Sequence, residues 1–215
     1  MTPSGHITAV ISDFGGVLTS PLADSFAAFE QSSGISGADL GAAMAAAHEQ
    51  LGAHPLFELE TGRLTELEFH AALGEQLTLS LGRPVEMTSF AELFLANLSA
   101  NLPMVARMRE LRAAGYRMAI CTNNVREWSE RWRAMLPVEE IFELVIDSSF
   151  VGFRKPEPEI YELTLAELGV TAAETLFIDD FEINCDGARA LGMTAVHFRD
   201  TDQALAEIDA ALAAA

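Results

Sequence analysis

The chain has 215 residues, half of them hydrophobic (50%), and a formal net charge of −19. This length suffices for one large domain or two small ones with a buried core. The negative charge argues against nucleic acid or an anionic membrane as a partner, because both carry charge of the same sign.

The two cysteines and the first residues indicate the setting of the protein. Cys121 and Cys185 form neither a disulfide framework nor a metal motif, so we expect both to be buried apolar residues. The alternative for Cys185 is a redox-sensitive thiol. Residues 1–5 lack a basic region, and no long apolar run follows them. We therefore expect a cytoplasmic protein, either a monomer or a homodimer.

The first predicted element is a strand over residues 7–13 that ends at Asp13, before Phe14, Gly15 and Gly16. Short apolar runs bounded by turn residues are typical of buried parallel strands. The glycines after Asp13 suit the close approach of a ligand to the backbone.

A helical pattern then extends to about residue 98, and we expect four or so helices to form a cap domain over residues 19–98. Thr65 and Glu68 form a capping-box pattern at the start of one of them. We expect this cap to select the substrate. The helix prediction rests on apolar residues at helical spacing. The candidate residues for selecting the substrate are His48, His54, Phe57 and Arg63. For each of them the alternative is packing in the core or a solvated position on the surface.

Residues 99–215 alternate between helix and strand, which predicts an α/β fold with a doubly wound, Rossmann-like parallel sheet. Residues 1–18 and 99–215 would form this core domain. Trp128 and Trp132 lie at i and i+4 of one predicted helix and are expected to face the core. The predicted strands are 117–122, 144–148, 175–179 and 194–198, and the helices are 104–114, 126–135, 157–168, 184–191 and 204–213.

Residues suited to phosphate chemistry follow these apolar runs. Thr122, Asn123 and Asn124 follow one predicted strand, Asp179 and Asp180 close another, and Lys155 lies in a loop. Because parallel strands in α/β sheets bind ligands beyond their carboxyl ends, these side chains should converge. Asp13 is a candidate nucleophile, the acidic pair suits Mg²⁺, and Lys155 and Thr122 suit phosphate oxygens. Asn184 is a candidate brace for the acidic pair.

Together these residues resemble the four motifs of the haloacid dehalogenase (HAD) superfamily, whose members are mostly Mg²⁺-dependent phosphatases. The finer pattern around Thr122, Lys155 and Asp179 is similar to the group that contains the N-terminal phosphatase domain of soluble epoxide hydrolase and some bacterial sugar-phosphate phosphatases. The resemblance implies catalytic roles for Asp13, Thr122 and Lys155, and phosphate binding by Thr122, Asn123 and Lys155. It implies Mg²⁺ binding by Asp13, the Gly15 carbonyl, Asp179 and Asp180, with Asp180 the direct ligand of the acidic pair.

The chain departs from the family pattern at Gly15, where most HAD phosphatases carry an aspartate that serves as general acid and base. Loss of proton transfer to the leaving group removes a contribution of roughly 10²–10⁴ in rate. The leading hypothesis is a Mg²⁺-dependent phosphatase that hydrolyses a small phosphorylated metabolite through an aspartyl-phosphate on Asp13. The alternatives are a haloacid dehalogenase-type hydrolase that attacks carbon, and a non-catalytic HAD-like binding protein.

Overall fold

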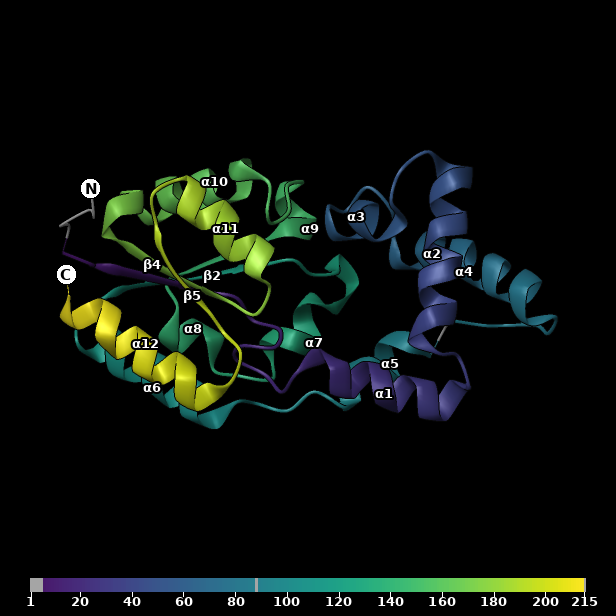
Figure 1. The fold of residues 1–215 in the computed structure, drawn as a ribbon, viewed down its shortest axis with the longest axis horizontal. Helices are drawn as coiled ribbons and strands as arrows, with labels where there is room; N and C mark the ends of the chain where they lie inside the picture. The colour runs from purple at the N-terminus through teal and green to yellow at the C-terminus, as the bar shows by residue number, and fades with distance from the viewer. Residues whose placement is uncertain (1–5, 88, 215) are drawn as a thin grey trace.

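The computed structural model describes residues 6–87 and 89–214, and a five-stranded parallel sheet forms its centre (Figure 1). The strand order is β3-β2-β1-β4-β5, so the chain crosses over on both sides of β1. Ser12 aligns with Ile120 on one side and with Ile178 on the other. This confirms the predicted doubly wound α/β fold. The strands are β1 (Ala9–Ser12), β2 (Arg117–Thr122), β3 (Leu144–Asp147), β4 (Thr175–Asp179) and β5 (Thr194–His197).

The central strands β1, β2 and β4 are buried on both faces because their alternate residues pack against two separate helical layers. Val10 and Ile120 belong to one hydrophobic cluster, and Ile11 and Cys121 belong to the other. Figure 1 shows one layer on either side of the sheet. One layer holds α6 (Leu102–Ala113), α8 (Val138–Ile141) and α12 (Thr201–Ala213), and the other holds α10 (Pro158–Leu168) and α11 (Glu182–Ala190).

Six helices lie between β1 and β2 in the sequence, and the first five of them stand beyond the carboxyl edge of the sheet (Figure 1). We call residues 21–97 the helical insertion. An antiparallel bridge between Thr19 and Ala100 joins the two connections to the sheet. The insertion consists of α1 (Leu22–Ser33), α2 (Gly37–Leu51), α3 (Pro55–Glu60), α4 (Glu66–Leu81) and α5 (Phe90–Ala96).

Local signals decide where several of these helices begin. Thr65 and Glu68 form the predicted capping box of α4, and Ser36 and Asp39 form another at α2. Such a box satisfies backbone N–H groups that have no partner within the helix. A third box, formed by Asp200 and Gln203, starts α12 three residues before the predicted position.

The predicted element list was wrong in four places. Helix α3 has only six residues, too few for a periodic signal, and was missed. The helix predicted over residues 126–135 is a 3₁₀ turn (Arg126–Trp128) followed by α7 (Ser129–Arg133). The short α8 and α9 (Ser148–Val151) were also missed.

Other sequence-based expectations are confirmed. Trp128 and Trp132 are buried, and the Trp132 ring packs against Phe14 with centroids 4.6 Å apart. Cys121 and Cys185 are buried free thiols, and burial raises the pKa of Cys185 to about 12, which argues against a redox-sensitive thiol. Each helix in the described part of the chain is too short or too polar to cross a membrane. Residues 1–5, on which the expected location partly rests, lie outside the described residues.

The sheet core predicts a large difference between two Leu→Ala substitutions. Leu176 is fully buried on β4, whereas Leu102 on α6 is 69% exposed. We expect Leu176→Ala to lower the free energy of unfolding by about 2–5 kcal/mol, since it leaves a cavity. Leu102→Ala should change it by less than about 0.5 kcal/mol. Urea unfolding of both variants measures the difference, and equal effects would contradict the described packing.

Candidate active site

The site is organised around the ammonium group of Lys155, which lies between two carboxylates. Its Nζ is 2.8 Å from Asp13 Oδ1 and 2.6 Å from Asp179 Oδ2. The Lys155 side chain is only 1% exposed, and Asp179 is fully buried. Asp13 follows β1, Asp179 ends β4, and Lys155 comes from the segment after β3, so three distant parts of the chain meet here as predicted.

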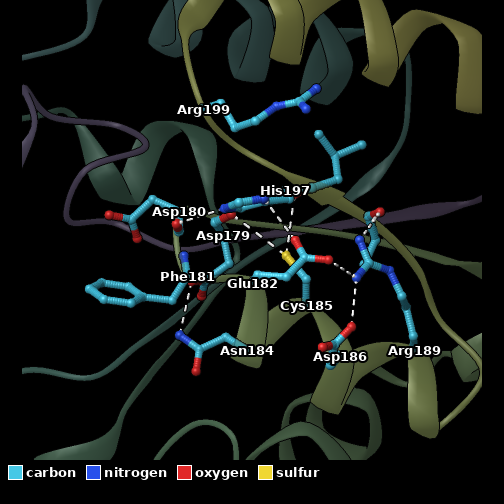
Figure 2. Close-up of polar contacts among 12 residues, drawn as sticks. Asp179, Asp180, Phe181, Glu182, Asn184, Cys185, Asp186, Arg189, His197 and Arg199 are labelled. Atoms are coloured by element: carbon cyan, nitrogen blue, oxygen red, sulfur yellow. Dashed lines mark hydrogen bonds and ion pairs between the residues drawn. The ribbon is translucent and has the colours of Figure 1, made fainter.

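Asp179 is held by protein groups on both of its carboxylate oxygens. Oδ2 accepts from Lys155, and Oδ1 accepts from the Phe181 N–H and from Asn184 Nδ2, each at 2.9 Å. Figure 2 shows Asn184 reaching toward the acidic pair from the start of α11. The structure therefore gives Asn184 the bracing contact that we expected. Both carboxylate oxygens of Asp179 thus have partners within the protein, and its predicted role at the metal site stays a prediction.

Asp180 differs because its Oδ1 is buried and has no hydrogen-bond partner among the described residues. Its carboxylate lies against Gly16, whose φ is +75°, and a Cβ on Gly16 would overlap Asp180 Oδ2. Only glycine permits both this backbone conformation and this approach. Ligand atoms of Asp13, Asp179 and Asp180 all lie within 4.8 Å of one another.

This donor set fits Mg²⁺, which binds hard oxygen ligands and usually keeps several waters. Three carboxylates surround one ammonium, so their formal charges leave an excess of two negative charges. One divalent cation would balance that excess, and the unpartnered Asp180 Oδ1 would be one of its ligands. The Gly15 carbonyl stays a predicted ligand.

The same crowding shifts the acidity of the cluster. Burial, together with the charge of Asp179, raises the pKa of Asp13 to about 6 although Lys155 opposes the shift. Burial and the charges of Asp13 and Asp179 raise the pKa of Asp180 to about 7. Burial alone would lower the pKa of Lys155, but Asp13 and Asp179 hold it well above its usual range, so Lys155 stays charged.

Asn123 fixes the segment that carries Lys155. Its Nδ2 donates to the Lys155 carbonyl at 3.0 Å, and its Oδ1 accepts from the Lys155 N–H at 2.8 Å. Both ends of the amide are therefore used inside the protein, and the phosphate contact of Asn123 stays a prediction. Thr122 is the buried last residue of β2, paired with Asp147 of β3.

An apolar side chain occupies the space beside Gly15. A Cβ at Gly15 would lie 3.3 Å from Cδ2 of Leu22, the first residue of α1. The place where the family pattern puts a general acid thus faces a hydrocarbon side chain.

Helix α3 contacts the segment that precedes Lys155. Arg154 pairs with Glu60 at 2.7 Å, and its guanidinium lies 3.9 Å from the centroid of the Phe57 ring. Ser148 Oγ donates to the Glu60 carbonyl at 2.5 Å. Sequence analysis missed this Glu60–Arg154 pair, because its members are 94 residues apart and no local pattern links them.

The candidate selecting residues lie in or near α3. His54 stacks on Phe57 with centroids 4.1 Å apart, and His48 of α2 is 6.1 Å from His54. Arg63 pairs with Glu58 at 2.8 Å and also donates to the Gly152 carbonyl at 3.5 Å. Two surface cavities of about 400 and 490 Å³ lie on the insertion, and neither is lined by the acidic cluster.

Comparisons with known proteins agree with this arrangement. Rat bifunctional epoxide hydrolase 2 is 35% identical over 131 residues, which are 58% of this chain and 24% of the rat protein. The chain thus spans about a quarter of the length of that relative. A sesquiterpene phosphatase of Aspergillus oryzae is 28% identical over 144 residues, covering 67% of this chain and 72% of that protein.

A solved HAD family enzyme from Bacteroides thetaiotaomicron has the same fold, with a TM-score of 0.69 and 24% identity. The match covers 88% of this chain and 92% of that one. The same enzyme has been solved with magnesium and inorganic phosphate. A family model described as haloacid dehalogenase-like hydrolase matches residues 7–192. The chain therefore belongs to the haloacid dehalogenase-like hydrolases.

Proposed function

We propose that the protein is a Mg²⁺-dependent phosphatase that hydrolyses a small phosphorylated metabolite through an aspartyl-phosphate on Asp13. The observation that supports this most directly is the buried Lys155 ammonium between Asp13 and Asp179, beside the unpartnered Asp180 oxygen. A dianionic phosphate approaches an anionic nucleophile only where positive charge offsets the repulsion. Lys155 supplies one such charge, and the acidic cluster has the donor set to hold a second.

The proposed reaction has two steps. Lys155 binds Asp13 Oδ1 and orients the carboxylate, so Oδ2 is the oxygen left to attack phosphorus. A bond forms between Asp13 Oδ2 and phosphorus as the phosphorus–oxygen bond of the ester breaks, and the leaving alkoxide takes a proton from water and departs as the alcohol. A water then attacks phosphorus, the bond to Asp13 breaks, and inorganic phosphate is released. Bound Mg²⁺ would screen the charges and stabilise the transferring phosphoryl group.

Phosphate is favoured over a carbon–halogen substrate by the acidic pair. Dehalogenation at carbon needs no metal, and it gives no use to the buried Asp180 oxygen that lacks a partner. Relatives named as phosphatases, including the Aspergillus enzyme, point the same way.

Within this proposal the helical insertion acts as the cap. The division into a core of residues 1–18 and 99–215 and a cap of residues 19–98 follows the bridge between Thr19 and Ala100. Contacts of α3 with Ser148 and Arg154, and of Arg63 after α3 with Gly152, support a cap that meets the core next to Lys155.

Removing the nucleophile tests the proposed mechanism. We expect Asp13→Asn to lower kcat for an aryl phosphate in Mg²⁺ by more than about 10³-fold, because the amide cannot form the covalent intermediate. The matched control is Asp24→Asn, at an exposed position in the first turn of α1. Release of inorganic phosphate, with and without EDTA, measures both. Full activity in EDTA would contradict the metal requirement.

Thermal stability tests the acidic cluster without depending on turnover. Because the pKa of Asp180 is raised from 3.8 to about 7, the folded protein binds more protons than the unfolded chain between these values. The protonated Asp180 carboxyl therefore stabilises the fold at low pH, and this contribution is lost as pH rises through about 7. In EDTA at pH 8 we expect Asp180→Asn to melt about 2–4 °C above the wild type, a difference that vanishes near pH 4.

Mg²⁺ should reverse that order by raising the melting temperature of the wild type more than that of Asp180→Asn. The exposed Asp202→Asn, in the first turn of α12, controls for a general effect of charge. A variant that melts below the wild type in EDTA at pH 8 would contradict the described carboxylate cluster.

Gly15 and Leu22 predict a leaving-group effect. Gly15→Asp combined with Leu22→Ala, which opens the space 3.3 Å away, should raise kcat/KM for alkyl phosphates by about 10-fold or more. Aryl phosphates leave readily without a proton and should gain less. A series of phosphates with different leaving groups measures how steeply kcat/KM depends on the pKa of the leaving alcohol, and this dependence is the slope. Leu22→Ala is the control. An unchanged slope would show that Gly15 does not limit proton transfer.

A further inference from the structure

Apolar side chains with large exposed surface occur on α3 of the insertion and on the segments that follow β3 and β4. We define the apolar rim as five residues that are each 40–62% exposed: Phe57, Phe150, Phe153, Phe181 and Ile183. Burying such side chains is favourable, so their exposure beside a site calls for an occupant.

The rim is tied to the catalytic residues by the chain itself. Phe181 directly follows Asp180, and its N–H bonds to Asp179. Figure 2 shows the Phe181 ring extending to the same side as the Asp180 carboxylate. Phe153 is two residues from Lys155, whose ammonium reaches Asp13. Phe57 comes from the insertion and lies against Arg154, which adjoins Lys155.

The cationic side chains of the same segments are already bound inside the protein. Arg63 pairs with Glu58, and Arg154 pairs with Glu60. Arg126 donates through Nε to the Ser149 carbonyl at 3.1 Å and lies over the Phe150 ring. Lys155 is held by the two aspartates. Within residues 13–22, 54–63, 122–128, 147–157 and 179–184, all described, the arginines and the lysine therefore each have an internal partner.

His54 adds no charge to this set. Its ring stacks on Phe57, and burial, with the charges of His48 and Arg154, lowers its pKa below the usual range. A second anionic group on the substrate, such as a carboxylate or another phosphate, would thus find no free cation in these segments. Desolvating it without a partner would be costly.

We infer that the substrate is a phosphate monoester whose remaining part is uncharged and apolar, with Phe181 and Ile183 as specificity-determining residues. This inference rests on the proposed phosphatase function and selects one substrate class within it. Lys155 and the acidic cluster take the phosphate, and the apolar rim takes the hydrocarbon. A polyol would leave its hydroxyl groups against phenyl rings, where they lose hydrogen bonds to water.

A chain-length series tests this inference. Each methylene that leaves water completely strengthens binding about fourfold. Because an open rim covers only one side of an alkyl chain, we expect a factor of about two for each methylene. The wild-type kcat/KM should then rise about 16-fold over the four methylenes that separate n-butyl from n-octyl phosphate, mainly through KM. Glycerol phosphate and phosphoglycolate, which carry hydroxyl and carboxylate groups, should be poorer substrates than n-butyl phosphate.

The variants locate the effect. Phe181→Ser combined with Ile183→Ser should reduce the octyl-to-butyl ratio of kcat/KM to about two, because the exposed side chains that cover the tail are gone. Leu79→Ser removes a 71% exposed leucine from α4 and should leave the ratio unchanged. A ratio that survives in the double variant, or wild-type preference for glycerol phosphate, would overturn the inference. Failure of the proposed function is distinct, since it would abolish Mg²⁺-dependent hydrolysis of an aryl phosphate as well.

Discussion

The ion pairs that Lys155 makes with Asp13 and Asp179 are the interaction on which the site depends. A single buried carboxylate is costly, and three that lie within 4.8 Å of one another repel as well. The ammonium offsets two of these charges directly, at 2.8 and 2.6 Å. Asn123 binds both the N–H and the carbonyl of Lys155, so the position of the charge is set by the backbone. The strand ends of β1 and β4 are thereby held in one geometry.

The segment that carries Lys155 also connects the site to the helical insertion. Arg154 pairs with Glu60, and Ser148 donates to the carbonyl of the same residue. Gly62, with φ at +68°, lies so close to the Ser149 carbonyl that a side chain there would overlap it. A displacement of α3 would therefore disturb these contacts along residues 148–154. In our proposal this places the selection of substrate and the binding of phosphate on adjacent residues of one segment.

Sequence patterns predicted the sheet and the acidic cluster because both depend on local signals. Apolar runs mark buried strands, and strand ends of a parallel sheet share one edge, so Asp13 and Asp179 could be placed together before their distance was known. The pairing of Glu60 with Arg154 and the approach of Leu22 to Gly15 depend on how the insertion packs. No periodicity encodes such contacts. Helix α3 was missed for a related reason, since six residues contain fewer than two turns.

The charged groups of the site lie in a single cluster, and the side chains around it, Leu22 and the apolar rim, are uncharged. Beside Gly15, where the family pattern has a carboxylate, the Leu22 side chain would lie 3.3 Å from a Cβ at position 15. Apolar surroundings lower the local dielectric and strengthen the attraction of Lys155 for anionic oxygens. The same surroundings offer no proton to a departing alkoxide, so that proton must come from water. In our proposal, electrostatic binding of the phosphoryl group and weak assistance to the leaving group both follow from this apolar packing.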